Sequence, residues 1–264
     1  MADNLDLGIA LGGGGAKGLS HIPFLAALDD LGVRPAMISG CSIGAIVGGL
    51  YAAGLSARDL AEILESDGFV SGAKQGMNLF SWAADGLGLL GGFLNDTLPV
   101  KDFGGLKHPA MFVASDFWTR EQVVMQEGDL VSAICASSAL PGLMKPVERA
   151  GRVLIDGGCV NPLPFDLLTG KVAHVAAISV AGAKNAEDAA LKPNRTNALF
   201  NAFQIMQNSI LREKLKANRV DFLAEPGLTN IRVFEFNRAD WIMESVSEDV
   251  DRFKYWIEAV VLQA

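Results

Sequence analysis

Short apolar runs alternate with glycine turns and helix-like periodicity in the first part of the chain. Leu5–Leu11 is an apolar run of strand length, and 19–31 carries apolar residues at the spacing of a helix with one buried face. A second unit repeats this order, with a strand at 36–39, a sharp turn at 40–44 and a helix at 45–53. Because strands that alternate with helices form parallel sheets covered on both faces, the pattern predicts a three-layer α/β/α fold with a mainly parallel central sheet.

The same alternation continues to the C-terminus. The pattern predicts further helices at 56–66, 129–137, 196–220 and 247–261, and further strands at 110–114, 122–125, 152–155, 172–180, near 222 and at 231–236. No internal repeat or linker marks a boundary, so residues 1–264 are expected to form one domain, which 196–264 completes with helices and short strands.

One segment departs from this regularity. Between 67 and 100, glycines mix with large apolar residues that follow neither a helical nor a strand period, namely Phe69, Phe80, Trp82, Leu87, Leu89, Leu90 and Phe93. Glycines permit hinge motion, and long irregular segments often cover binding sites. We therefore interpret 67–100 as a lid over an apolar pocket; the alternative is that these side chains complete the core beneath an irregular loop.

Composition and charge exclude several classes of protein. Half of the 264 residues are hydrophobic, enough for one large core, and the net charge of −8 argues against binding to nucleic acid or electrostatic adhesion to anionic membranes. The longest nearly apolar run, Ile43–Leu55, is too short to span a bilayer, and the N-terminus lacks the pattern of a secretory signal. We expect a cytoplasmic protein, at most peripheral at a membrane through transient hydrophobic contact.

Three scattered cysteines form neither a disulfide framework nor a metal site. Cys41, Cys135 and Cys159 read as small hydrophobic residues of a reduced compartment. The chain has no other clustered ligand set, so the sequence predicts no metal and no cofactor.

The turn at 40–44 is the first candidate for chemistry. Its sequence, Gly40-Cys41-Ser42-Ile43-Gly44, is G-x-S-x-G between a predicted strand and a predicted helix, which is the context of a nucleophile elbow. The two glycines allow the backbone to turn sharply and present the Ser42 hydroxyl at a helix N-terminus. The alternative is that small residues simply let the helix pack closely on the strand.

The glycine loop after the first strand is the second candidate. Gly13, Gly15 and Gly18 allow several backbone N–H groups to point at one position beside a helix N-terminus, which suits an oxyanion. The same spacing occurs in dinucleotide-binding folds, but the second strand here ends in Gly40-Cys41-Ser42 instead of the acidic residue that binds a ribose. Leu19 follows Gly18, so the loop does not match a P-loop either.

A serine nucleophile needs a base, and two residues compete for that role. Ser42, Asp156 and His174 occur in the chain order of an α/β-hydrolase triad, although His174 lies within the predicted strand at 172–180. Asp156 ends the predicted strand at 152–155, at the carboxyl edge where open α/β sheets bind ligands. Alone, Asp156-Gly157 would read as a turn in which the aspartate bonds its own backbone.

Together these segments resemble the patatin-like phospholipase family. The resemblance rests on the G-G-G-x-K-G loop at 13–18, G-x-S-x-G at 40–44 and Asp156-Gly157-Gly158, in that order. Two further stretches, 136–142 (S-x-x-x-P-G) and 161–164 (N-P-L-P), are similar to family segments as well. The match covers about two thirds of the chain and leaves the C-terminal third without a motif.

The resemblance implies a function and a mechanism. Lipid carboxylic esters, as in phospholipids or lysophospholipids, would be cleaved through an acyl-enzyme by a Ser42–Asp156 dyad without histidine, with the amides of Gly13, Gly14 and Gly15 as the oxyanion hole. Lys17 stands where the family often has arginine and is a candidate substrate contact. Alternatives are the same chemistry on a glyceride or polyester, and a nucleotide-binding module that uses the glycine loop.

Overall fold

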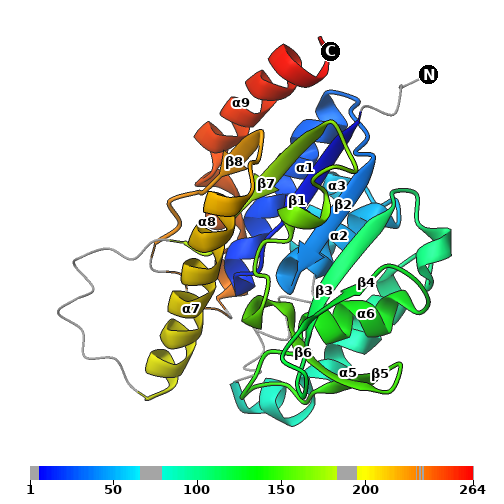
Figure 1. Ribbon diagram of the computed structural model, residues 1–264, viewed down its shortest axis with the longest axis vertical. Coiled ribbons are helices and arrows are strands. Elements are labelled where there is room, and N and C mark those ends of the chain that lie inside the picture. The colour runs from blue at the N-terminus through cyan, green and yellow to red at the C-terminus, as the bar shows by residue number, and fades with distance from the viewer. Residues whose placement is uncertain are drawn as a thin grey trace.

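An eight-stranded sheet runs through the part of the chain that the structure describes (Figure 1). The structure, a computed structural model, describes residues 6–65, 79–182, 195–229, 231, 233 and 235–263. The strands follow the order β5-β6-β3-β2-β1-β7-β8, and β4 also pairs with β3. Their bounds are β1 Leu7–Leu11, β2 Met37–Cys41, β3 Ala110–Asp116, β4 Gln122–Met125, β5 Val147–Arg149, β6 Arg152–Asp156, β7 His174–Ile178 and β8 Phe222–Ala224.

The sheet divides into a parallel and an antiparallel part. The neighbours β3, β2, β1, β7 and β8 all run parallel, whereas β3 pairs antiparallel with β4 and β6, and β5 pairs antiparallel with β6. The prediction of a mainly parallel central sheet is therefore confirmed. The antiparallel part arises because β4 and β6 both return along β3.

Helices cover both faces of the sheet, as the alternation of strands and helices predicted. Along β1, Ile9 and Leu11 belong to a large core on one face, and Ala10 belongs to a smaller core on the other, as the alternation of strand side chains requires. The large core includes side chains of most helices, whereas the smaller one includes Leu211 of α7 and the segment around Phe165. The helices are α1 His21–Asp30, α2 Ile43–Ala52, α3 Ala57–Glu65, α5 Leu79–Thr97, α6 Leu130–Ser137, α7 Arg195–Ala217, α8 Ala239–Glu244 and α9 Ser247–Trp256.

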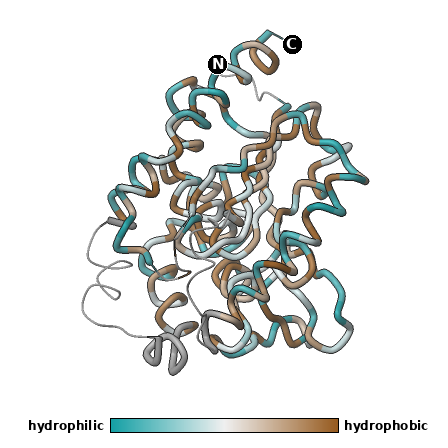
Figure 2. The backbone as a smooth tube through the Cα atoms, turned by 90° about the vertical axis from the view of Figure 1, so that its left-hand side faces the viewer, coloured by the Kyte–Doolittle hydropathy of each residue, from teal (hydrophilic) through white to brown (hydrophobic). Residues whose placement is uncertain are grey.

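Hydropathy follows this layering. In Figure 2 the central strands are mostly white and brown, and the hydrophilic teal is concentrated on outer helices and turns. No helix among the described residues has the length and hydropathy needed to cross a membrane.

The segment expected to be irregular contains a helix. Residues 67–78 of the predicted 67–100 segment lie outside the described residues, but Leu79–Thr97 forms α5. Leu90 and Leu94 of this helix are 2% and 0% exposed and belong to the large core beside α6. The prediction of irregular structure was wrong at 79–97, because tertiary packing of one apolar stripe outweighs the low helix propensity of the glycines.

The prediction of a strand at 231–236 was also wrong for the described residues of that segment. Ile231 and Val233 lie outside any strand, and Phe236–Arg238 forms a 3-10 turn. The Val233 carbonyl accepts a hydrogen bond from Ala16 N–H at 2.8 Å. This stretch thus bonds to the glycine loop instead of extending the sheet beside β8.

Candidate active site

Two strands that run in opposite directions end at neighbouring positions of β3. Cys41, the last residue of β2, pairs with Val113, and Asp156, the last residue of β6, pairs with Ala114. Because β4 pairs with both β3 residues, it occupies the opposite edge of β3, and β2 and β6 share one edge. The strand ends therefore meet head to head, which brings the residue after Cys41, Ser42, to Asp156.

Ser42 lies on a strained turn between β2 and α2. Its backbone has φ 54° and ψ −122°, a conformation that residues with a side chain rarely adopt. A Cβ at Gly44 would lie 2.1 Å from the Leu11 carbonyl oxygen, and one at Gly40 would lie 2.5 Å from the Gly44 carbonyl oxygen. Both glycines are thus required for the close approach of α2 to the strands, and the turn has the geometry of a nucleophile elbow.

Two neighbouring serines brace this elbow. The Ser42 N–H donates to Ser137 Oγ at 3.0 Å, and Ser138 Oγ donates to the Ser42 carbonyl oxygen at 3.2 Å. Both serines belong to the S-x-x-x-P-G segment, which begins at the C-terminal end of α6. Hydrogen bonds at both ends of the Ser42 peptide hold a conformation that would otherwise relax.

Asp156 is a buried carboxyl group with an unusual pKa. It is 1% exposed, and its Oδ1 accepts a hydrogen bond from Gly158 N–H at 2.7 Å. Burial raises the pKa of Asp156 to about 6, against the opposing effects of the Ser42 hydroxyl and the Gly158 N–H. Oδ2 is buried and makes no hydrogen bond of full geometry with the described residues, although the Ser42 hydroxyl is near enough to act on the pKa.

The position after Asp156 leaves no room for a side chain and is occupied by Gly157. A Cβ there would lie 2.2 Å from the Val113 carbonyl oxygen and 3.1 Å from Cys41 Sγ. The turn therefore packs directly against β3 and the end of β2. The D-G-G motif at 156–158 keeps the carboxylate at this junction.

The glycine loop approaches the elbow from the end of β1. Gly12 N–H donates to the Ile178 carbonyl at 3.0 Å, and Gly13 N–H donates to the Pro162 carbonyl at 2.9 Å. Gly14 and Gly15 follow at the start of the 3-10 helix Gly15–Ser20 and line the pocket around Ser42. The first N–H groups of a helical turn have no partner within it.

Lys17 and Gly18 of the loop face the protein interior. Lys17 is 4% exposed and its ammonium donates to the Ala181 carbonyl, so it lies away from the residues that line the pocket. The position of Lys17 gives no support to the substrate contact expected for it. Gly18 lies against Ile43, whose Cγ2 would be 2.3 Å from an added Cβ, which places the loop directly on the first turn of α2.

His174 lies away from the Ser42–Asp156 pair. His174 is the first residue of β7 and pairs with Leu7, whereas Leu11, at the carboxyl end of β1, leads into the glycine loop. At about 3.3 Å per residue, His174 is some 13 Å from that end of the sheet. Its ring contacts Trp256 of α9 with the ring centroids 6.4 Å apart, so it takes no part in a triad.

His21 has a structural contact with the loop. It is completely buried, and its Nε2 lies 2.8 Å from the Gly12 carbonyl oxygen. Burial lowers the pKa of His21 to about 4, so the ring is neutral at pH 7 and Nε2–H donates to Gly12. His21 thereby fixes the start of the glycine loop.

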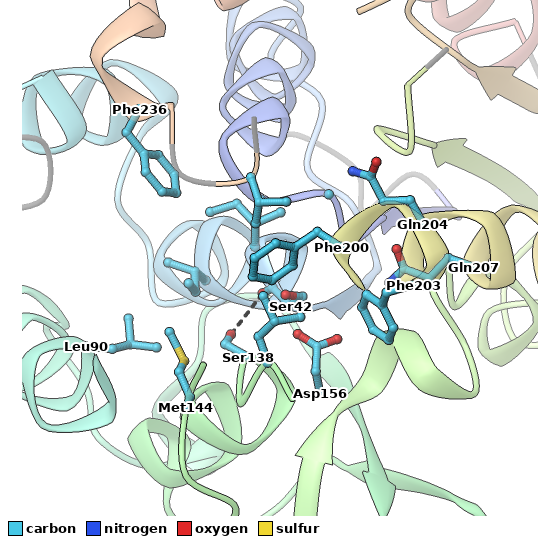
Figure 3. A pocket seen from close by; sticks show the side chains of 16 residues that line it. Ser42, Leu90, Ser138, Met144, Asp156, Phe200, Phe203, Gln204, Gln207 and Phe236 are labelled. Atoms are coloured by element: carbon cyan, nitrogen blue, oxygen red, sulfur yellow. Dashed lines mark hydrogen bonds between the residues drawn. The ribbon is translucent and has the colours of Figure 1, made fainter. Parts of the chain in front are cut away.

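A pocket opens above the serine and the aspartate (Figure 3). It encloses about 700 Å³, including the space open to solvent at its mouth. Most of its lining is apolar and comes from five regions, α2, α5, the 138–144 segment, the N-terminal half of α7 and the 233–236 segment. The apolar side chains are Ile43, Ile46, Leu90, Leu140, Met144, Phe200, Phe203, Val233 and Phe236. Among the described residues, no group of histidine, cysteine and acidic side chains could hold a metal ion.

A comparison with protein families assigns the chain. The sequence model described as "Patatin-like phospholipase" matches residues 9–169, which contain the glycine loop, the elbow and the aspartate turn. The chain belongs to the patatin-like phospholipase family. The resemblance noted from the motifs is confirmed, and the matched region ends before α7.

Relatives of this chain are identical to it at about a third of the aligned positions. An uncharacterized NTE family protein of Mycobacterium bovis is 32% identical over 205 residues, which are 73% of this chain and 54% of that protein. "Lysophospholipase NTE1" of Candida glabrata is 34% identical over 170 residues, which are 60% of this chain and 9% of that protein. The chain thus spans about half the length of the M. bovis relative.

A solved structure of low sequence identity has the same fold. VipD from Legionella pneumophila superposes with a TM-score of 0.54 at 14% identity, over 94% of this chain and 66% of that one. The two proteins therefore share a fold over most of this chain.

Sequence reasoning missed the contribution of α7 to the pocket. Phe200, Phe203, Gln204 and Gln207 project from this helix into the pocket (Figure 3). One signal was available, because residues 196–211 contain no charged side chain although they form more than four turns of a helix at the surface.

Proposed function

We propose that this chain is a lipid acyl hydrolase that cleaves carboxylic esters of phospholipids or lysophospholipids, with Ser42 as nucleophile and Asp156 as general base. One observation carries the proposal. A serine on a strained elbow meets a buried carboxyl group, with a pKa of about 6, at the floor of an apolar pocket. The relatives include a protein named as a lysophospholipase, which supports the substrate class.

The reaction proceeds through two transfers of an acyl group. The Ser42 hydroxyl oxygen attacks the ester carbonyl carbon, and its proton passes to the Asp156 carboxylate. The tetrahedral intermediate collapses when the carbon–oxygen bond to the alcohol breaks, and Asp156 returns the proton to the departing alcohol oxygen. Water then attacks the carbonyl carbon of the acyl-enzyme and gives a proton to Asp156. Asp156 passes this proton to the departing Ser42 oxygen, which releases the fatty acid and restores Ser42.

The pKa of Asp156 suits this role. A general base is most effective when its pKa lies near the working pH, and a positioned base contributes about 10² to 10⁴ in rate. A carboxyl group at its ordinary pKa would be a weak base at pH 7. Burial in the turn at 156–158 supplies the shift without a histidine.

The glycine loop supplies the oxyanion hole in this proposal. Gly14 and Gly15 line the pocket with Ser42, and their N–H groups are the candidate donors. The Gly13 N–H, which was expected to contribute as well, is already bonded to the Pro162 carbonyl and so fixes the loop. Each donor to a developing oxyanion is worth about 10² to 10³ in rate.

The alternative of nucleotide binding has less support. Phosphate recognition uses cationic side chains beside a glycine loop, but Lys17 donates to a backbone carbonyl in the interior, and the described residues that line the pocket include no lysine or arginine. A glyceride or polyester remains the competing substrate class for the same mechanism.

Contact with lipid aggregates is part of the proposal. The outward side of α7 exposes Leu199, Ile205 and Met206 (58%, 63% and 56% exposed), while its inward side lines the pocket. Apolar residues exposed beside an apolar pocket are typical of a surface that meets lipid. Sedimentation with phosphatidylcholine vesicles tests this contact, which Ile205→Ser with Met206→Ser should weaken.

Labelling with a fluorophosphonate tests the assignment of the nucleophile. The probe phosphonylates activated serines, and mass spectrometry of the digested protein locates the modified residue. We expect labelling at Ser42, and none in the Ser42→Ala variant. Ser138→Ala is the matched control, since Ser138 also lines the pocket but donates to the Ser42 carbonyl; labelling at Ser138 instead of Ser42 would overturn the proposal.

A further inference from the structure

The side chains around Ser42 fall into two chemically different groups. Figure 3 shows Leu90 and Met144 on one side of Ser42, and Asp156, Phe203 and Gln207 on the other. The first side is apolar. The second side is the one to which the general base belongs.

The position of the base fixes which part of an ester lies on each side. In the reaction proposed above, Asp156 must return its proton to the alcohol oxygen that leaves. The alcohol moiety therefore lies toward Asp156 and the side chains next to it. The acyl chain then extends toward Leu90 and Met144, where it finds apolar surface.

Gln207 is the polar side chain packed closest to the aspartate turn from α7. It is only 5% exposed, and its Nε2 lies 2.0 Å from the position that a Cβ of Gly158 would take. Asp156 Oδ1 lies 2.9 Å from that same point. The amide thus occupies the space beside the carboxylate that the second glycine of the D-G-G turn leaves open.

The chemistry of Gln207 selects a kind of alcohol. A glutamine amide both donates and accepts, as does a hydroxyl group, and a buried amide gains most from a substrate that satisfies it. Asp156 is the only charged side chain among the described residues that line the pocket, so nothing there neutralises a phosphate. A phosphate group on the substrate would have to lie beyond the pocket mouth.

We propose that Gln207 is a specificity-determining residue that recognises a free hydroxyl on the alcohol moiety of the ester, next to Asp156, while the acyl chain lies against Leu90 and Met144. This inference rests on the proposed function. The shared chemistry it names is a monoacylated glycerol, whether as a monoacylglycerol or as a lysophospholipid. A diacyl phospholipid has no free hydroxyl at this position.

The test compares two esters that differ only in the alcohol. Glycerol monodecanoate carries free hydroxyl groups, and propyl decanoate carries none. For Gln207→Leu we expect kcat/KM to fall about tenfold or more with the glycerol ester and less than about threefold with the propyl ester, since a site built to bond a hydroxyl loses its discrimination when the partner is removed. Asn208→Leu, at the next position of the same helix but outside the pocket lining, is the matched control and should leave the ratio unchanged.

Two further comparisons extend the test. The first asks whether the free hydroxyl also matters in a phospholipid, and the second tests the side of the pocket assigned to the acyl chain. Hydrolysis of lysophosphatidylcholine should fall in Gln207→Leu as hydrolysis of glycerol monodecanoate does. Hydrolysis of a diacyl phosphatidylcholine should not fall. Met144→Trp should slow long acyl chains relative to butyrate esters without changing the preference for glycerol over propanol.

Equal losses on the glycerol and propyl esters would overturn the inference, because Gln207 would then only support the turn at 156–158. Unchanged activity of Gln207→Leu on both esters would overturn it as well. Failure of the proposed function is a separate outcome, recognised when Ser42→Ala retains hydrolysis of both esters.

Discussion

Cys41 and Asp156 lie end to end along one edge of β3, opposite Val113 and Ala114. The parallel strand β2 and the antiparallel strand β6 approach each other from opposite directions. Ser42, the residue after Cys41, therefore lies next to Asp156, the last residue of β6. A sheet that was parallel throughout would place both strand ends at the same edge but on separate strands. The antiparallel return of β6 therefore makes a two-residue site possible without a histidine from another loop.

The two residues of the proposed dyad should behave as one unit. Ser42→Ala and Asp156→Asn should each lower kcat for a short p-nitrophenyl ester by about 10³-fold or more, because each removes the proton transfer that activates the nucleophile. The double variant should be little worse than either single one. Circular dichroism of each variant shows whether the fold is retained, and losses that add in free energy would contradict a dyad.

The pairing of Ser42 with Asp156 shows where sequence reasoning succeeds. Glycines at 40, 44 and 157 mark close backbone approaches, and these are local requirements that a motif records directly. The strand ends at Cys41 and Asp156 could be placed from apolar runs that stop at a glycine. Their meeting was implied only by family resemblance, since periodicity does not reveal that β6 runs antiparallel to β3.

The C-terminal third illustrates the opposite case. The sequence predicts a long helix at 196–220, and in the structure α7 spans Arg195–Ala217. Which of its faces lines the pocket depends on tertiary packing, which buries Leu211 and Gln207 and exposes Ile205. The helix α5 was missed for a related reason, because its buried Leu90 and Leu94 are stabilised by α6 and not by helix propensity.

The activity should depend on pH through Asp156. Burial raises the pKa of this carboxyl to about 6, and the base must be ionised to accept the Ser42 proton. We therefore expect kcat/KM to rise with pH and level off above an apparent pKa of about 6, in a profile measured with a p-nitrophenyl ester whose own chemistry does not titrate there. A limb near 4 would mean that the carboxyl is not desolvated in solution.

The same pKa has a consequence for stability that provides an independent control. The folded protein binds the proton more tightly than the unfolded chain, whose aspartate has the ordinary pKa of 3.8, so stability falls as pH rises between about 4 and 6. Asp156→Asn removes this ionisation. It should stabilise the fold above pH 6 by up to about 2–3 kcal/mol and bring little gain below pH 4, as measured by urea unfolding.

The glycine loop should tolerate no side chain at Gly14. A Cβ there would lie 2.4 Å from the Val180 carbonyl oxygen, so Gly14→Ala must displace the loop from its position over Ser42. Since oxyanion donors act mainly in the transition state, we expect kcat to fall about 10²-fold or more with a smaller change in KM. The matched control is Gly92→Ala in α5, where no atom lies within 4 Å of an added Cβ and activity should be retained.

Two adjacent leucines of α5 decide between a lid and a core element. Leu89 is 42% exposed, whereas Leu90 is 2% exposed and lines the pocket. If α5 is part of the core, Leu90→Ala should cost about 2–5 kcal/mol of unfolding free energy, and Leu89→Ser should cost less than about 0.5 kcal/mol. The burial of Leu90 and Leu94 in the large core favours this outcome for the helix itself.

A mobile lid gives a different pattern for the same two variants. A helix that detaches from the core during each turnover contributes little to stability, so both variants would leave the melting temperature nearly unchanged. Both would then reduce hydrolysis of long-chain lipid in vesicles more than hydrolysis of a short soluble ester, since only the former needs an apolar cover that opens onto lipid. Thermal melts and the two activities, measured on one preparation of each variant, separate these patterns. A large loss of melting temperature confined to Leu90→Ala would assign α5 to the core and leave a lid only to the residues before it.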